Sequence, residues 1–204
     1  MPISYHQEDL PGDVDLGDVV AVDTETLGLN PDRDRLCVVQ LSGGQGDCHI
    51  VHFRGQRYDA PNLCRMLSDP ATLKLFHFAR FDLAVLKRYL GTMCKPVYCT
   101  KIASKIARTY TDRHGLKDLC QELLGIDLSK QMQSSDWGAL ELSDAQLSYA
   151  SHDVLHLHAL RKRLDEMLRR EGRDHLTGPC FDFLPHRAEL DLAGWANTDI
   201  FAHS

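Results

Sequence analysis

The stretch Val19-Val20-Ala21-Val22-Asp23-Thr24-Glu25-Thr26 determines how the rest of the chain is interpreted. Four apolar residues in a row predict a buried strand, and two acidic residues follow almost at once. Because side chains alternate along a strand, Asp23 and Glu25 emerge on the same side. Two carboxylates so close repel each other unless a cation lies between them. The stretch therefore indicates either a metal site or a turn whose acidic residues are solvated or cap a helix.

Around this stretch, short apolar runs and turn signals predict further strands in the first half of the chain and helices in the second. Strands are expected over residues 19–22, 35–42, 48–53 and 73–78. Helices are expected over residues 62–67, 80–90, 101–109, 116–124 and, as the longest, from 143 to about 170. Ser143 and Gln146 have the spacing of a capping box at the start of that longest helix. The expected class is α/β: a mixed sheet flanked by helices, with a helical C-terminal half.

Size and composition favour one domain over residues 1–204, with its core at about 19–170. The chain has 204 residues and is 43% hydrophobic, which is enough for a full core. The tail, residues 177–204, carries too many apolar side chains for a solvated end. We expect the tail to pack on its own domain or on a neighbouring subunit.

Charge and cysteine usage restrict the partners and the compartment. The net charge of −6 argues against a long nucleic-acid footprint, which needs a basic stripe, but not against a short one. The seven cysteines are odd in number and include no Cys-x-x-Cys pair, which suits a reducing cytoplasm. The N-terminus does not read as a signal peptide, and no apolar run approaches the roughly 18 residues of a membrane span. We therefore expect a cytoplasmic protein that does not enter the membrane.

Two later acidic signals are weak when taken singly. Asp82 is expected near the start of a helix, where capping electrostatics explains it equally well. Tyr149 and Asp153 are four residues apart on one helical face, which could be a surface hydrogen bond.

Taken together, these signals resemble the tyrosine subtype of the DEDD 3′–5′ exonucleases, in the RNase D branch. The order is an acid pair after the first strand, an acid after a later strand, and Tyr-x-x-x-Asp on a late helix. The stretches SKQMQSSDW (129–137) and LSDAQLSYASHDVLHL (142–157) carry the same resemblance. Ser148 fills the place of the base in the histidine subtype, whereas Tyr149 fills the tyrosine place. One departure is Phe78, where many relatives have Asn. The resemblance implies an RNase H-like exonuclease fold.

The same resemblance implies a two-metal hydrolase with Mg²⁺ or Mn²⁺, two ions per active site. Asp23, Glu25, Asp82 and Asp153 would be the metal ligands, and carboxylate oxygens suit these hard cations. Tyr149 would aim the attacking water. A free phenol has a pKa of about 10, so we interpret Tyr149 as a water-positioning group.

Over its whole length the chain is more similar to the nanoRNase C group. The stretches that carry this similarity are VAVDTETLGLNPDRDRLCVVQLS (20–42), CTKIASKIARTYTDRHGLKDLC (99–120), SKQMQSSDW, and the tail segments FLPHRAELDLAGW (183–195) and DIFAHS (199–204). The similarity implies cleavage of short RNA, preferentially dinucleotides such as pGpG, and assembly as a ring-shaped homo-octamer. An RNase D-like enzyme that trims longer RNA, such as tRNA 3′ ends, or DNA is the alternative. An inactive nucleic-acid-binding module is disfavoured, since all four acids and the tyrosine are present.

Several residues are candidates for substrate contact. Leu29 could wedge between two bases or be ordinary packing. Arg113 and His114 could grip a 5′-phosphate or belong to a solvated loop. The remaining substrate-binding candidates are Thr26, His77, Phe81 and Gln133, and Trp137 is a further candidate for the pocket wall.

Overall fold

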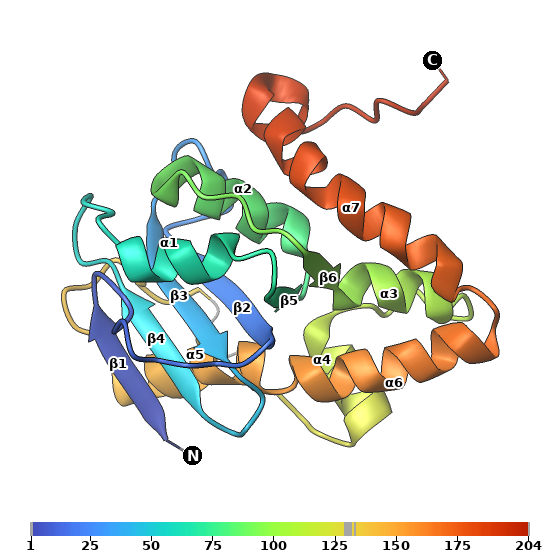
Figure 1. Cartoon of the computed structure of the whole chain (residues 1–204), viewed down its shortest axis with the longest axis horizontal. Coiled ribbons are helices and arrows are strands. Elements are labelled where there is room, and N and C mark those ends of the chain that lie inside the picture. Colours follow the sequence, from blue (N-terminus) through green and yellow to red (C-terminus); the bar gives the residue numbers. More distant parts are fainter. Residues whose placement is uncertain (1, 129–131, 133, 204) are drawn as a thin grey trace.

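The computed structural model describes residues 2–128, 132 and 134–203 and centres on a six-stranded mixed sheet (Figure 1). The strand order is β1-β4-β3-β2-β5-β6. The strands are β1 (Ile3–Gln7), β2 (Val19–Thr26), β3 (Leu36–Ser42), β4 (Cys48–His52), β5 (Leu73–Phe76) and β6 (Val97–Cys99). The helices are α1 (Pro61–Ser68), α2 (Ala79–Leu90), α3 (Thr100–Ala107), α4 (Leu116–Leu119), the π-helix η1 (Cys120–Leu124), α5 (Asp144–Leu155), α6 (Leu157–Arg170), α7 (Asp174–Leu190) and the π-helix η2 (Asp191–Trp195). The expected α/β class with a mixed sheet is confirmed.

Strand β2 lies inside the sheet and is covered on both faces. It pairs antiparallel with β3 and parallel with β5. Helices α1 and α2 lie over one face of the sheet, and α5 lies over the opposite face (Figure 1). Val20, Ala21 and Val22 are fully buried, as a strand covered on both sides requires. The C-terminal end of β2 therefore opens among helices from both layers.

Strand β5 ends earlier than the sequence predicted. Its last residue is Phe76, and Phe78 has a left-handed backbone with φ of 71°. A residue in that conformation cannot continue a strand, so the chain turns directly into α2 at Ala79. Gly91 ends α2 with φ of 69°, the left-handed helix end that glycine allows.

The predicted single helix from 143 to about 170 is wrong in one respect, because it divides at His156. There φ and ψ are −99° and −7°, and α6 begins at the next residue. The break lets α5 cover the sheet while α6 packs against α3. Hydrophobic spacing did not reveal the break, because Val154 and Leu157 are both fully buried across it. The capping box of Ser143 and Gln146 is confirmed.

Both ends of the chain add structure outside the predicted core. Strand β1 was not predicted, and it extends the sheet by pairing parallel with β4. Helix α7 packs against α2 and α3, and its residues Phe181 and Leu184 are buried. Beyond α7, Trp195 and Phe201 are 48% and 75% exposed. In the part of the chain that the structure describes, no helix combines the length and apolar character that a bilayer crossing requires.

Replacing Ser143 with Ala should lower the free energy of unfolding by about 1 kcal/mol, since it removes the acceptor for the Gln146 backbone N–H. Urea denaturation measures the effect. Ser148→Ala is the matched control, because Ser148 is an exposed residue within the same helix. Equal effects of the two changes would contradict a capping role.

Candidate active site

Three carboxylates meet where the C-terminal end of β2 faces α5. Asp23 and Glu25 come from β2, and Asp153 comes from α5. One oxygen from each lies within 4.8 Å of the others. All three side chains are partly buried, so they share a recess and not an open surface. The structure thus brings together residues that are up to 130 positions apart in the sequence.

The fourth predicted acid, Asp82, lies behind this cluster at the start of α2. It is only 3% exposed, and its Oδ1 accepts a hydrogen bond of 2.7 Å from the Thr24 hydroxyl. Thr24 lies between Asp23 and Glu25 in β2. The hydrogen bond therefore attaches α2 to the strand that carries the acid pair.

Burial and mutual repulsion favour the protonated forms of these acids. Burial raises the pKa of Asp23 to about 7. Burial, followed by repulsion from Asp23, Asp153 and Asp82, raises the pKa of Glu25 to about 10. The pKa values of Asp82 and Asp153 are also well above the usual range, first through burial and then through the charge of Asp23. The protein alone cannot keep all four carboxylates charged at neutral pH.

A divalent cation would remove this conflict. Carboxylate oxygens are the ligands that Mg²⁺ and Mn²⁺ prefer, and the three clustered oxygens are close enough to share an ion. Among the described residues, this is the only group of three or more His, Cys, Asp or Glu side chains with such spacing. The donor set therefore fits a hard divalent cation.

Tyr149 lies one helical turn before Asp153 on α5 and lines the same recess. Its ring centroid is 6.1 Å from that of Trp137, which is buried. Burial, and then the charges of Asp153, Glu25 and Asp23, raise the pKa of Tyr149 well above its ordinary value. The phenol therefore stays protonated at neutral pH and can position a water molecule by hydrogen bonding.

The recess is a cavity of about 330 Å³ that also holds two lysines. Lys101 comes from the start of α3, and its Nζ lies 4.4 Å from the centroid of the Phe78 ring. Lys117 comes from α4 and pairs with Asp127 at 3.1 Å. Sequence reasoning missed both, because no spacing along the chain places the starts of α3 and α4 beside the acids. The cavity thus combines carboxylates that can hold a metal with cations that can contact an anion.

His77 also lines the cavity and is neutral. Burial, aided by the charge of Lys101, lowers its pKa to about 3. Its Nδ1 lies 2.9 Å from Thr100 Oγ1, and the Thr100 hydroxyl donates to the Phe76 carbonyl at 3.2 Å. Because the Thr100 hydroxyl proton is used in the bond to Phe76, the Thr100 oxygen acts as the acceptor toward His77. His77 Nδ1 therefore carries the hydrogen, and Nε2 is left as an acceptor.

A second cavity of about 520 Å³ adjoins the first, and both include Phe78 in their walls. Leu29 and Phe81 line it, and Leu29 is 87% exposed. The loop that presents Leu29 is held by Asp34, whose Oδ2 accepts from the Asn30 N–H at 3.0 Å. Gly28 packs against this carboxylate: a Cβ atom at position 28 would lie 2.3 Å from Asp34 Oδ2, so Asp34 would have to shift and its hold on the loop would be disturbed.

Of the other predicted substrate residues, those that the structure describes do not line this cavity. Arg113 is bound to Asp118, and His114 Nδ1 lies 2.8 Å from Ser104 Oγ. Neither lines the cavity, although Gly115, which follows them, does. The Thr26 hydroxyl donates to the Gly28 carbonyl within its own loop. Gln133 lies outside the described residues.

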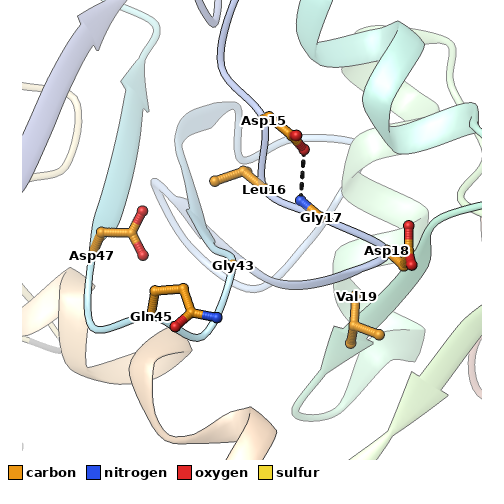
Figure 2. Close-up of a pocket in the computed structure, with 8 residues that line it drawn as sticks. All are labelled: Asp15, Leu16, Gly17, Asp18, Val19, Gly43, Gln45 and Asp47. Carbon is orange, nitrogen blue, oxygen red and sulfur yellow. Dashed lines mark hydrogen bonds between the residues drawn. The ribbon is translucent and has the colours of Figure 1, made fainter.

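A separate acidic hollow of about 360 Å³ lies at the opposite end of β2 (Figure 2). Asp15, Asp18 and Asp47 line it, and Asp15 Oδ1 accepts the Gly17 N–H at 2.9 Å. These acids do not form a group with metal-binding spacing among the described residues. The cavity at the C-terminal end of β2 is therefore the better candidate.

Comparisons with known proteins show the family to which the chain belongs. Residues 7–169 match a family model described as 3′–5′ exonuclease. Ribonuclease D of Gluconacetobacter diazotrophicus is 36% identical over 154 residues, which cover 76% of this chain and 39% of that protein. This chain thus spans about two fifths of the matched Ribonuclease D.

Solved structures match the whole chain. Brucella melitensis NrnC bound to pGG is 57% identical with a TM-score of 0.97, and each chain is covered completely. Brucella melitensis NrnC with bound Mg²⁺ is also 57% identical and completely covered, with a TM-score of 0.95. The predicted resemblance to RNase D and nanoRNase C is confirmed.

The metal-free protein should lose stability as the pH rises from about 4 to about 7. The pKa of Asp23 is raised from 3.8 to about 7 on folding, so in this interval the folded state keeps a proton that the unfolded state releases. Urea denaturation in EDTA measures the decline, which Mg²⁺ should reduce by replacing the proton.

Asp23→Asn is the matched variant, because it keeps the shape of the side chain and removes its titration. The decline of its unfolding free energy over the same pH interval should be shallower. Parallel pH profiles for the variant and the wild type would contradict the electrostatic account.

Proposed function

The chain belongs to the 3′–5′ exonuclease family, and from that premise we propose that it is a metal-dependent exoribonuclease specialised for very short RNA. Its preferred substrates are dinucleotides, which it converts to nucleoside 5′-monophosphates. The observation that carries this proposal is the complete match to the Brucella protein bound to pGG, at 57% identity. The catalytic cavity of about 330 Å³ is consistent with a small substrate.

Asp23, Glu25, Asp82 and Asp153 would hold two Mg²⁺ or Mn²⁺ ions. Bound there, the ions would make a water molecule more acidic and stabilise the charge that develops on the phosphate. The Brucella protein with bound Mg²⁺ supports this cofactor. Thr24, by its hydrogen bond of 2.7 Å to Asp82, keeps that carboxylate aimed at the cluster.

Tyr149 would orient the attacking water without removing its proton. The water oxygen forms a bond to the scissile phosphorus, and the bond from phosphorus to the 3′ oxygen of the preceding nucleotide breaks. The 3′-terminal nucleotide leaves with the phosphate on its 5′ oxygen, and the 3′ oxygen of the preceding nucleotide takes up a proton to become a hydroxyl, which balances the proton that the attacking water releases. Water is the nucleophile, so no covalent enzyme intermediate forms.

The walls of the two cavities suggest how a dinucleotide lies. Lys101 and Lys117, which line the first cavity, would contact phosphate oxygens. The acceptor Nε2 of His77 suits a ribose hydroxyl. Leu29, which is 87% exposed, would separate the two bases, and Phe81 would line the space for one of them. Arg113 and His114, which directly precede the cavity residue Gly115, would contact the 5′-phosphate.

We further propose a ring-shaped homo-octamer in the cytoplasm. The exposed apolar side chains of Trp195 and Phe201 would supply part of a subunit interface. All seven cysteines are free, which suits a reducing compartment.

RNase D-like trimming of longer RNA is the second candidate function. The relationship to Ribonuclease D, at 36% identity, favours it. It predicts efficient shortening of long single strands, whereas the net charge of −6 favours a short footprint.

With Mg²⁺, the enzyme should cleave a 5′-labelled dinucleotide at least tenfold faster than RNAs of about five, seven or twenty residues. The reason is that the two cavities can hold a whole dinucleotide, so this substrate needs no further contact with the protein surface. A cleavage time course on the length series measures this preference. Asp23→Asn should remove activity on every length, which shows that a contaminating nuclease is not responsible. Faster shortening of the longest RNA would favour the trimming enzyme instead.

Replacing Leu29 with Ala should reduce kcat/KM for dinucleotides about tenfold, which corresponds to about 1.4 kcal/mol of apolar contact with the bases. Steady-state kinetics measures the effect. Leu140→Ala is the matched control, because Leu140 is also largely exposed, at 72%, and lies outside both cavities. If both variants retain wild-type kinetics, Leu29 does not act on the bases.

A further inference from the structure

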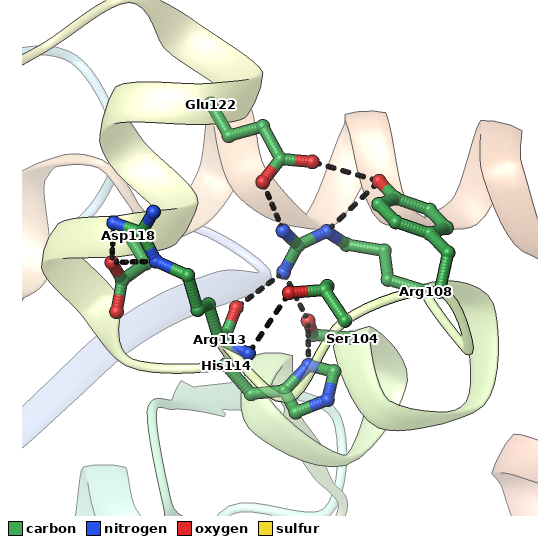
Figure 3. Close-up of polar contacts among 8 residues, drawn as sticks. Ser104, Arg108, Arg113, His114, Asp118 and Glu122 are labelled. Atoms are coloured by element: carbon green, nitrogen blue, oxygen red, sulfur yellow. Dashed lines mark hydrogen bonds and ion pairs between the residues drawn. The ribbon is translucent and has the colours of Figure 1, made fainter.

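Arg108, at the C-terminal end of α3, has a fully buried guanidinium. Its Nη1 donates to the Arg113 carbonyl at 2.7 Å and to Ser104 Oγ at 3.0 Å (Figure 3). Its Nε donates to the Tyr110 hydroxyl at 3.3 Å, and its Nη2 pairs with Glu122. All three nitrogens are therefore engaged, as a buried cation requires.

Glu122, on η1, completes this network and balances its charge. The Tyr110 hydroxyl donates to Glu122 Oε1 at 2.7 Å. That hydrogen bond, together with Arg108, holds the pKa of Glu122 below its usual range. The ion pair is thus maintained at neutral pH, and it joins α3 to η1 across the segment between them.

The segment joined in this way is the loop that leads into the catalytic cavity. Arg108 holds the loop at the Arg113 carbonyl, and Ser104, which Arg108 also contacts, holds the ring of His114. The next residues, Gly115, Leu116 and Lys117, line the cavity beside Asp23 and Tyr149. A shift at Arg113 would therefore displace the cavity wall within two residues.

None of the contacts made by Arg108 involves a carboxylate of the metal cluster. Its partners are the loop backbone, Ser104, Tyr110 and Glu122. Loss of these contacts would change the wall that faces the substrate and leave the ligands on β2 and α5 in place. Loss of the Arg108 contacts should therefore weaken substrate binding and leave metal binding unchanged.

We propose that Arg108 is a positioning residue for substrate recognition. Through Glu122, Ser104 and the Arg113 carbonyl it sets the position of residues 110–117, and thereby of the substrate phosphate contacts made from this loop. The inference rests on the proposed function, since it assigns a role in binding the substrate of that same site.

The test is steady-state kinetics of Arg108→Lys and Glu122→Gln on the substrate that the wild type cleaves fastest. Lysine keeps the charge but cannot form the same fork of hydrogen bonds. Glu122→Gln leaves the arginine in place and removes its counter-charge, so this variant tests the same network if Arg108→Lys does not fold. Each variant should raise KM at least fivefold, with kcat and the Mg²⁺ concentration for half-maximal activity within about twofold of wild type.

Arg173→Lys is the matched control. Arg173 donates to the Ile106 carbonyl at 3.1 Å and to Thr109 Oγ1 at 3.4 Å, so it supports the same end of α3 without touching residues 110–117. Its KM should stay near the wild-type value. Mg²⁺-induced thermal shifts of all variants provide a readout of the metal site that is independent of activity.

An unchanged KM in the folded Arg108 and Glu122 variants would overturn the inference. So would a loss of kcat or of the Mg²⁺-induced thermal shift at constant KM, or an equal rise of KM in Arg173→Lys. Failure of the proposed function would look different, because the wild type itself would then not cleave short RNA.

Discussion

Repulsion among four carboxylates at the C-terminal end of β2 is the constraint on which the rest of the structure depends. Burial and proximity raise the pKa values of Asp23, Glu25, Asp82 and Asp153 together, so the fold without a cation holds charges that it cannot satisfy. A fold can maintain such a site only if its elements are rigid. The fully buried centre of β2 and the helices on both faces of the sheet provide that rigidity.

The topology explains why the acids come from such distant segments. Strand β2 supplies two of them, and its parallel neighbour β5 leads directly into α2, which supplies Asp82. Helix α5 approaches from the opposite face with Asp153 and Tyr149. The left-handed turn at Phe78 allows α2 to start close enough for Thr24 to reach Asp82. The four acids are therefore held by three different elements, β2, α2 and α5, and the cluster exists only in the assembled domain.

Basic side chains lie in and beside the catalytic cavity although the protein as a whole is acidic. Lys101 and Lys117 line the cavity, and the buried Arg108 is bonded to the loop that leads into α4, the helix that carries Lys117. The net charge of −6 therefore coexists with a local supply of cations beside the carboxylates. Such an arrangement suits recognition of a few phosphates inside a recess better than attraction of a long polyanion along a surface.

The sequence by itself determined the fold class, the family and the residues from which the catalytic chemistry is proposed. The acid pair after a buried strand, Asp82, and the Tyr149–Asp153 spacing are local patterns, and together they resemble one family. Local patterns cannot report strands that depend on distant pairing, which is why β1 and β6 were not predicted. The break at His156 was missed for another reason, because buried apolar residues continue across it. Only the tertiary structure decided that Lys101 faces the acids, that His77 is neutral, and that Arg108 is bonded to the loop. The physical reason is that burial, hydrogen-bond partners and pKa values arise from contacts between residues far apart in the chain, which no spacing along it specifies.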